Sequence, residues 1–178
     1  MQLFKRTPIE AFQNIKDFDY QTRYFSDLTS LNYEYKDFRI AYIDESNEAE
    51  NGTLLFIHGH PTWSYLWRHL IPIALEQDYR VVAIDLPGFG KSDKPLIKDF
   101  FTFKNYRDII LSFIDKLNLK NITLVLHEWG GTLGLTLPME NPKKYLGVIC
   151  FNSYINNNLV KVDANYLNWI ETNIKNDD

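Results

Sequence analysis

The sequence predicts an α/β domain in which a mostly parallel sheet carries helices on both faces. Short apolar runs alternate with longer amphipathic stretches, and this order is typical of parallel sheets. Each run is too short for a helix and has no regular polar alternation, so each is predicted to be a strand buried on both faces. The four predicted strands are Thr53–Ile57, Arg80–Ile84, Ile122–Leu126 and Val148–Phe151.

Helices are predicted between these strands, and a strand pair is predicted before them. The helical patterns cover residues 63–76, 106–117 and 132–139. Upstream, Tyr33–Tyr35 and Phe38–Ile43 predict an antiparallel pair with Lys36-Asp37 as a turn. We expect this pair to form one edge of the sheet.

The composition is that of one globular domain. The chain has 178 residues, of which 45% are apolar and 24% are charged. A chain of this length buries about 70% of its unfolded surface without needing metal or disulfide links. Lys and Arg number 19 against 23 Asp and Glu, a net charge of −4. Since no basic run stands out, we expect no nucleic-acid partner.

The cysteine and histidine content predicts neither a disulfide nor a metal site. Cys150 is the only cysteine and cannot close an intrachain bridge. One Cys and four scattered His do not reproduce a zinc ligand set, so we expect no metal and no other cofactor. The first residues lack the apolar run of a signal peptide or membrane helix. We therefore expect a cytoplasmic protein with no membrane partner.

Ligands bind open parallel sheets at the carboxyl ends of the strands, so the segments that follow the apolar runs are candidate sites. In His58–Trp63, Gly59 permits tight backbone passage, and the following helix start leaves N–H groups for an oxyanion or halide. The segment Asp85–Asp93 matches neither the Walker pattern nor GxGxxG. Its Pro and Gly residues are ordinary turn residues, so we interpret it as a structural loop.

The most informative segment is Leu126–Gly131, which lies between a buried strand and a helix. This is the setting of a nucleophile elbow, a strained strand-to-helix turn that raises one side chain above the sheet. Glu128 holds the elbow position, and Gly130 allows the helix to pack closely. An acidic residue before a helix can also act only as a helix cap or dipole partner, so that interpretation stays open.

From Arg6 to Ser153 the chain resembles the haloalkane dehalogenases of the α/β-hydrolase superfamily. The matching segments occur in order and at matching spacing, and those that carry the resemblance are His58–Arg68, Phe89–Pro95, Asn121–Val125 and Gly134–Met139. The resemblance implies the α/β-hydrolase fold, a small halogenated substrate and covalent catalysis by an elbow carboxylate.

The resemblance also implies roles for three residues. Glu128 stands at the nucleophile position, Trp129 matches the tryptophan whose indole N–H holds the departing halide, and His60 occupies the oxyanion-side position after His-Gly. Donors directed at developing negative charge are among the largest catalytic contributions. Epoxide hydrolases share the His-Gly-x-Pro and x-Trp-Gly-Gly patterns, so an epoxide is the alternative substrate.

Two departures from the family pattern predict little or no activity for the lone chain. Glu128 replaces the family's aspartate, and its extra methylene displaces the carboxylate by about 1 Å, which can cost roughly 100-fold in rate. The four histidines are residues 58, 60, 69 and 127, so none follows the elbow, although hydrolases of this fold place the catalytic His there.

The resemblance suggests that the chain lacks the C-terminal strands and most of the cap. We interpret residues 1–155 as a partial α/β-hydrolase core and residues 156–178 as the start of a helical cap with a polar C-terminal end. Residues 163–174 place three apolar side chains on one helical face. The match therefore predicts a chain truncated within the cap.

Three functional hypotheses stay open from the sequence. The chain is the amino-terminal part of a hydrolase whose cap, acid and His come from a separately encoded C-terminal segment. It is alternatively an inactive remnant, or a binding module that keeps the donors of His60 and Trp129 without chemistry.

Overall fold

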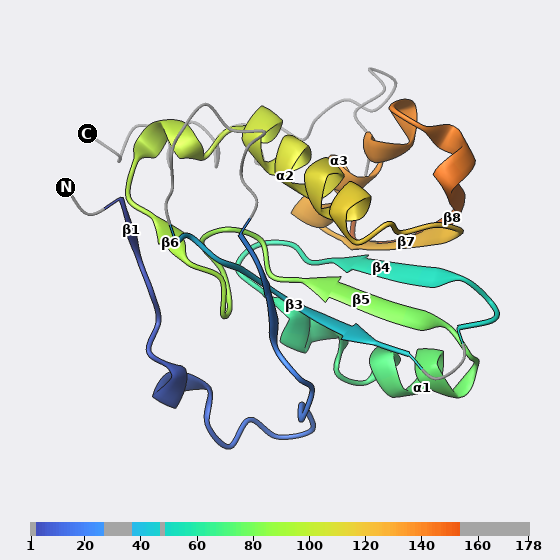
Figure 1. Cartoon of the computed structure of the whole chain (residues 1–178), viewed down its shortest axis with the longest axis horizontal. Coiled ribbons are helices and arrows are strands. Elements are labelled where there is room, and N and C mark those ends of the chain that lie inside the picture. The colour runs from blue at the N-terminus through green and yellow to red at the C-terminus, as the bar shows by residue number, and fades with distance from the viewer. Residues whose placement is uncertain (1–2, 27–36, 47–48, 154–178) are drawn as a thin grey trace.

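A six-stranded sheet forms the centre of the molecule, with helices on both faces (Figure 1). The computed structural model describes residues 3–26, 37–46 and 49–153. In spatial order the sheet strands are β2 (Arg23–Phe25), β3 (Ile40–Glu45), β5 (Arg80–Ile84), β4 (Thr53–Ile57), β7 (Ile122–His127) and β8 (Tyr145–Phe151). From β5 to β8 all neighbours are parallel, whereas β2 and β3 add an antiparallel edge. The predicted mostly parallel sheet is confirmed.

The helices divide between the two faces of the sheet. Helix α1 lies on one face, and α2 and α3 lie on the other (Figure 1). The α-helices are α1 (Leu70–Glu76), α2 (Phe103–Lys116) and α3 (Trp129–Gly134). Single turns of 3-10 helix are η1 (Ile9–Phe12), η2 (Ser64–Trp67), η3 (Lys98–Phe100), η4 (Leu137–Met139) and η5 (Pro142–Lys144), and β1 (Phe4–Lys5) pairs with β6 (Lys94–Pro95).

Two predicted helices are divided in the structure, and proline explains both divisions. The stretch 63–76 forms η2 and then α1, because the Pro72 ring would clash with a carbonyl of the preceding turn if the helix continued back through it. The stretch 132–139 forms α3, which begins at Trp129, and then η4, which contains Pro138. Helix α2 starts three residues earlier than expected, where the Thr102 side chain accepts a hydrogen bond from Asn105 N–H.

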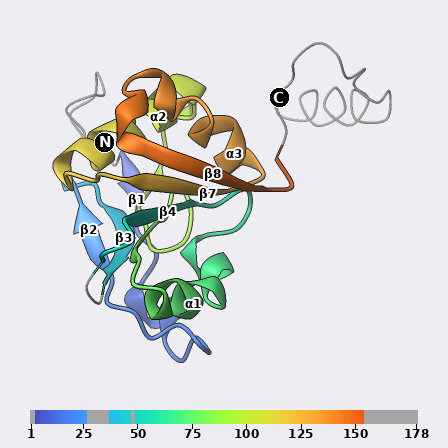
Figure 2. The same cartoon turned by 90° about the vertical axis from the view of Figure 1, so that its right-hand side faces the viewer.

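The strand predictions hold best in the centre of the sheet. Strands β4 and β5 have the predicted bounds, β7 extends to His127, and β8 starts at Tyr145. The expectation that β8 is buried on both faces is wrong, because most of its side chains are exposed. No described strand pairs with its outer edge (Figure 2).

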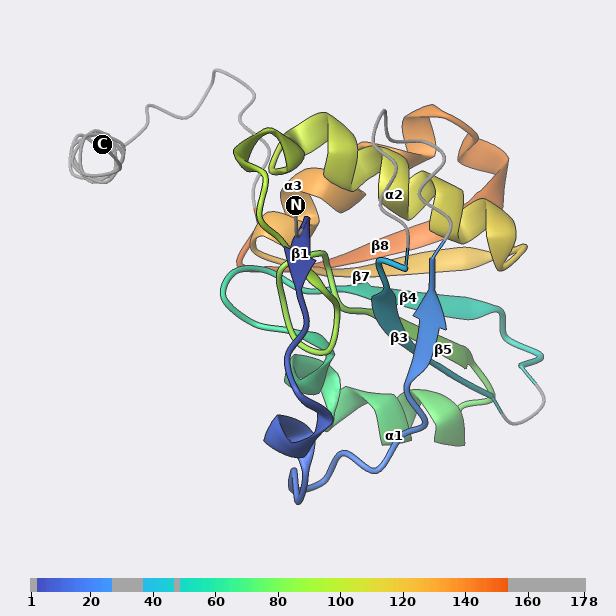
Figure 3. The same ribbon diagram turned by 60° about the vertical axis from the view of Figure 1, so that its left-hand side comes forward.

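The amino-terminal edge also differs from the prediction. Strand β3 overlaps the predicted Phe38–Ile43 strand, but it lies inside the sheet between β2 and β5 (Figure 3). Its antiparallel partner at the edge is Arg23–Phe25, a strand of three residues that is too short to stand out in the apolar pattern. The predicted partner 33–35 lies outside the described residues, as do residues 163–174.

Two apolar cores fill the spaces between the sheet and its helices. The first lies under α2 and α3 and contains Phe38, Phe100 and Phe113 with the inward residues of the strands. The second lies under α1 and contains Phe56, Trp67 and Ile71. No helix among the described residues is long and apolar enough to cross a bilayer.

Candidate active site

The site lies where strands β4 and β7 end side by side. The two strands are parallel, and Ile57 lies opposite Leu126 in their register. The loop after β4 therefore meets the turn after β7 at the carboxyl edge of the sheet, where open α/β sheets bind ligands. Two of the three candidate segments from the sequence, His58–Trp63 and Leu126–Gly131, come together at this edge.

Glu128 occupies a strained turn between β7 and α3. Its backbone has φ 48° and ψ −117°, a conformation that residues with a side chain rarely adopt. Its N–H donates to the Phe151 carbonyl (3.1 Å), and its own carbonyl accepts from Gly131 N–H (2.9 Å). The Ser153 hydroxyl also donates to the Glu128 carbonyl (3.2 Å). The end of β8 and the first turn of α3 thus hold the strained residue in place.

Two glycines allow the segments to approach this closely. A Cβ at Gly130 would overlap the carbonyl oxygen of Ile57, so only glycine lets α3 begin directly against the end of β4. A Cβ at Gly59 would lie 2.5 Å from Oε2 of Glu128. The expectation that Gly130 permits close packing of the helix is confirmed.

The Glu128 carboxylate is held by the loop after β4. The backbone N–H of His60 donates to Oε2 of Glu128 at 2.8 Å. The His60 ring packs on Phe89, with ring centroids 4.5 Å apart, and lies 5.7 Å from the Trp129 ring. Partial burial lowers the pKa of His60, an effect that the nearby Glu128 carboxylate opposes. The neutral imidazole is therefore favoured near pH 7.

Trp129 brings an unused hydrogen-bond donor to the same place. Its indole Nε1 is buried and has no hydrogen-bond partner within the protein. A buried N–H without a partner costs free energy, and this one belongs to the residue that follows Glu128, with its ring 5.7 Å from the His60 ring. A small anion bound at this nitrogen would satisfy it.

The remaining conspicuous residues of the two loops have structural roles. His58 is fully buried, and its Nε2 accepts from Leu86 N–H (2.9 Å) while its Nδ1 lies 2.9 Å from the Gly59 carbonyl. Burial lowers the pKa of His58, and the Asp85 carboxylate opposes this. Asp85 in turn accepts from Ser64 N–H and Lys91 N–H. These bonds show that His58 and Asp85 order the two loops, which agrees with the interpretation of Asp85–Asp93 as a structural loop.

The sequence did not indicate two further residues that contact Glu128 or His60. Ser153 fastens the end of β8 to the Glu128 turn, and Phe89 supports the His60 ring. Phe89 lies between two glycines of a loop that matched no ligand pattern, and a lone serine after a strand carries no signal at all.

The described residues contain neither a base that follows Glu128 in the chain nor a metal site. His127 immediately precedes Glu128, but its ring lies on the other side of the strand, where it contacts Trp67. No group of three or more potential metal ligands occurs in residues 3–26, 37–46 and 49–153.

The fold and the turn at Glu128 define an α/β-hydrolase architecture, and the chain belongs to the alpha/beta hydrolase fold family, whose model matches residues 52–177. Among curated proteins, the haloalkane dehalogenase of Psychrobacter cryohalolentis is 39% identical over 150 residues, which are 84% of this chain and 48% of that protein. The haloalkane dehalogenase of Mycolicibacterium paratuberculosis is 33% identical over 150 residues, which are again 84% of this chain and 48% of that protein. The chain spans about half the length of the curated relatives it matches.

Solved structures support the same relationship. The tetrameric haloalkane dehalogenase DpaA from Paraglaciecola agarilytica superposes with a TM-score of 0.87 at 39% identity, over 98% of this chain and 57% of that one. An epoxide hydrolase mutant from Vigna radiata superposes less well, with a TM-score of 0.66 at 25% identity, over 84% of this chain and 45% of that one. By sequence identity the chain is nearer to the dehalogenase DpaA than to this epoxide hydrolase.

Proposed function

We propose that the chain is the core of a haloalkane dehalogenase-like hydrolase and that Glu128 is its nucleophile. The observation that carries this proposal is the carboxylate on a strained turn, held at Oε2 by His60 N–H, together with a buried indole N–H on the next residue, Trp129, that has no partner within the protein. The hydrogen bond fixes Oε2 of Glu128 and leaves Oε1 free to attack a substrate. The indole N–H of Trp129 is available to bind the anion that leaves. The turn is thus a nucleophile elbow.

In the first step Oε1 of Glu128 attacks the carbon that bears the halogen. A carbon–oxygen bond forms, the carbon–halogen bond breaks, and its electron pair leaves with the halide. The Trp129 indole N–H receives the halide, since it is a donor in a site partly shielded from water. Oε2 becomes the carbonyl oxygen of the new ester and keeps its hydrogen bond from His60 N–H, which is placed to stabilise an oxyanion at that atom.

The second step is hydrolysis of this ester, and it needs a base that activates water. His58 is occupied by its hydrogen bonds, and His127 lies on the other side of the strand. We infer that the acid and the His of the family lie outside the described residues of this chain. Residues 3–153 alone then turn over very slowly or not at all.

Halide release tests this function. The chain is mixed with the C-terminal half of the Psychrobacter cryohalolentis dehalogenase, the part beyond its match, and supplied with a short 1-bromoalkane. We expect repeated bromide release from the mixture and none from the same mixture with Glu128→Gln. Equal release from both mixtures would refute the role of Glu128.

An epoxide is the second candidate substrate. The epoxide hydrolase structures superpose with this chain, but at lower identity than the dehalogenases. The same mixture supplied with a terminal epoxide distinguishes the two, because epoxide opening gives a diol. Diol formed without any bromide release from the bromoalkane would assign the site to epoxides.

We place the chain in the cytoplasm and without a resident cofactor. Cys150 is free and exposed, which suits a reducing compartment. The proposed chemistry uses only a carboxylate, backbone and indole N–H groups, and water.

A further inference from the structure

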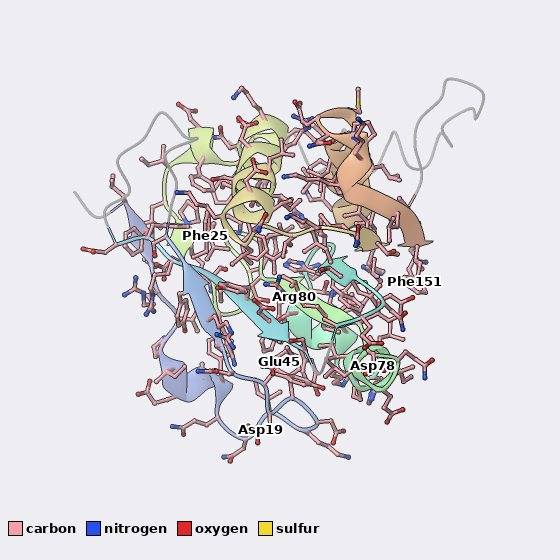
Figure 4. The ribbon with its side chains drawn as sticks, turned by 45° about the vertical axis from the view of Figure 1, so that its right-hand side comes forward. Asp19, Phe25, Glu45, Asp78, Arg80 and Phe151 are labelled. Carbon is pink, nitrogen blue, oxygen red and sulfur yellow. The ribbon has the colours of Figure 1, made fainter. Side chains whose placement is uncertain are left out.

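A pocket of about 530 Å³ lies between the amino-terminal segment and the β2 edge of the sheet. Its lining consists of residues 6–10, Phe12, Tyr24, Arg39 and Lys91. Phe25, which follows Tyr24 on β2, lies on the opposite side of the molecule from Phe151 at the end of β8 (Figure 4). The pocket is therefore distinct from the site at Glu128, whose N–H donates to the Phe151 carbonyl.

Three cationic side chains line this pocket, and they differ in their partners. The Arg6 guanidinium is held by Asp93, whose carboxylate accepts from Nε and from Nη2 at 2.7 Å each. The Lys91 ammonium donates only to the Thr22 hydroxyl, at 2.9 Å. The Nε of Arg39 is buried and has no hydrogen-bond partner within the protein. Among the described residues, no carboxylate forms an ion pair with Arg39 or Lys91.

The charges that line the pocket favour an anion. Glu10, exposed on η1, is the one carboxylate among the described lining residues, and it faces three cations, of which Arg6 is neutralised by Asp93. Burial lowers the pKa of Lys91, an effect that the Asp85 carboxylate opposes. An anion in the pocket would compensate this ammonium for the water that it has lost.

Aromatic rings lie beside the two cations that have no ion pair. The Arg39 guanidinium lies over the Tyr24 ring, with Cζ 4.2 Å from the centroid, and Lys91 Nζ lies 5.8 Å from the Phe12 centroid. A guanidinium stacked on a ring has a fixed plane, and its N–H groups match two oxygens of a carboxylate or phosphate. The volume falls within the roughly 300–1,000 Å³ of small-molecule sites, which is more than inorganic phosphate needs.

We propose that this pocket binds a small organic anion in which a carboxylate or phosphate group is attached to a planar ring. The anionic group binds the Arg39 guanidinium and the Lys91 ammonium, and the ring lies against Phe12. This ligand satisfies the unpaired Nε of Arg39 and fills a volume that a lone inorganic anion leaves open. The proposal is independent of the chemistry at Glu128, which does not line the pocket.

Isothermal titration calorimetry of the full chain with matched probes tests this proposal. Phenyl phosphate carries the anion and the ring, inorganic phosphate carries only the anion, and phenol carries only the ring. We expect phenyl phosphate to bind roughly 10-fold more tightly than either of the other two, and its binding to weaken as salt is added. Benzoate in the same assay distinguishes the two anionic groups, since the tighter of benzoate and phenyl phosphate identifies the group that the pocket prefers.

Charge substitutions locate the bound anion. Arg39→Gln should weaken phenyl phosphate binding roughly 10-fold or more, because it removes charge-assisted hydrogen bonds. Glu10→Gln should strengthen binding roughly threefold, because it removes the opposing carboxylate at an exposed position. Arg23→Gln is the matched control, since Arg23 is exposed on β2 and lines no part of the pocket. It should leave the affinity unchanged.

The NMR signal of the Arg39 Nε–H should shift when phenyl phosphate is added, which gives a second measurement that needs no variant. Equal affinity for phenyl phosphate and inorganic phosphate, or equal weakening by Arg39→Gln and Arg23→Gln, would overturn the proposal. Weaker binding in Glu10→Gln, or no binding of any probe at millimolar concentration, would overturn it as well. Circular dichroism of each variant before titration excludes loss of fold as the cause of weak binding.

Discussion

The backbone N–H of His60 donates to Oε2 of Glu128 at 2.8 Å, although the two residues are 68 positions apart in the sequence. The parallel pairing of β4 and β7 brings their carboxyl ends together, and Gly59 and Gly130 remove the side chains that would keep the two segments apart. One carboxylate oxygen is therefore fixed before any substrate arrives, and such preorganisation is a large part of catalytic power.

The length of the Glu128 side chain should limit the rate of ester formation. Glu128→Asp retracts the carboxylate by about 1 Å, toward the position of the family's aspartate, and we expect bromide release by the reconstituted mixture to rise roughly 100-fold. Stopped-flow measurement of the first equivalent of bromide checks this, with Glu128→Gln as the inactive control. A slower Asp variant would show that the longer side chain is required.

The indole of Trp129 should bind halide in the absence of substrate. Bromide or iodide is expected to quench tryptophan fluorescence with a saturable component, because the buried Nε1–H has no other partner. This component should disappear in Trp129→Phe and persist in Trp63→Phe, whose ring stacks on Tyr65 away from Glu128. Quenching that is unchanged in Trp129→Phe would remove this residue from the site.

Close packing at the start of α3 should make Gly130 intolerant of any side chain. Gly130→Ala directs a Cβ into the Ile57 carbonyl, so we expect a loss of about 3 kcal/mol in the free energy of unfolding. Gly147→Ala on β8 is the matched control, because its Cβ would meet nothing nearer than Thr123 at 3.9 Å. It should change stability by no more than about 0.5 kcal/mol. Urea unfolding measures both, and equal losses would contradict the packing described here.

Buried His58 should make the fold sensitive to acid. Its pKa is lowered by burial, so below its ordinary pKa of about 6.5 the unfolded chain binds a proton that the folded chain excludes. The free energy of unfolding is therefore unaffected by His58 titration above about pH 6.5. Below that pH it falls by up to about 1.4 kcal/mol for each pH unit because of His58.

Urea midpoints between pH 8 and pH 5 check the role of His58. In His58→Gln the urea midpoint should fall less steeply between pH 6.5 and pH 5 than in the parent chain. In His69→Gln, at an exposed position before α1, the urea midpoint should fall as steeply as in the parent chain. An identical decline in all three proteins would assign the acid sensitivity to other groups.

Local patterns predicted the centre of the fold and pointed to the strand-to-helix turn at Glu128. The apolar runs at residues 53–57 and 80–84 have the bounds of β4 and β5, because strands buried on both faces leave an uninterrupted apolar signal. Glu128 was found because its place between a strand and a helix is itself a local signal. The bond from His60 was not predictable from spacing, since it depends on which strands are neighbours.

The errors have equally specific causes. Tyr145–Phe151 has the composition of an internal strand but is an edge strand among the described residues, since burial depends on neighbours that sequence composition does not reveal. Arg23–Phe25 is the reverse case, a strand of three residues that is too short to carry an apolar pattern and is defined by its pairing with β3. Ser153 acts through its hydroxyl on the Glu128 carbonyl, a contact with no sequence signature.

Peptide mass mapping of the chain after incubation with a 1-bromoalkane tests the central claim most directly. We expect one alkyl group per chain, carried as an ester on the peptide that contains Glu128, with one equivalent of bromide released. The adduct should persist in Cys150→Ser, which removes the exposed thiol, and be absent in Glu128→Gln. An alkyl group found only on Cys150, or an adduct that survives Glu128→Gln, would contradict the assignment of Glu128 as the nucleophile.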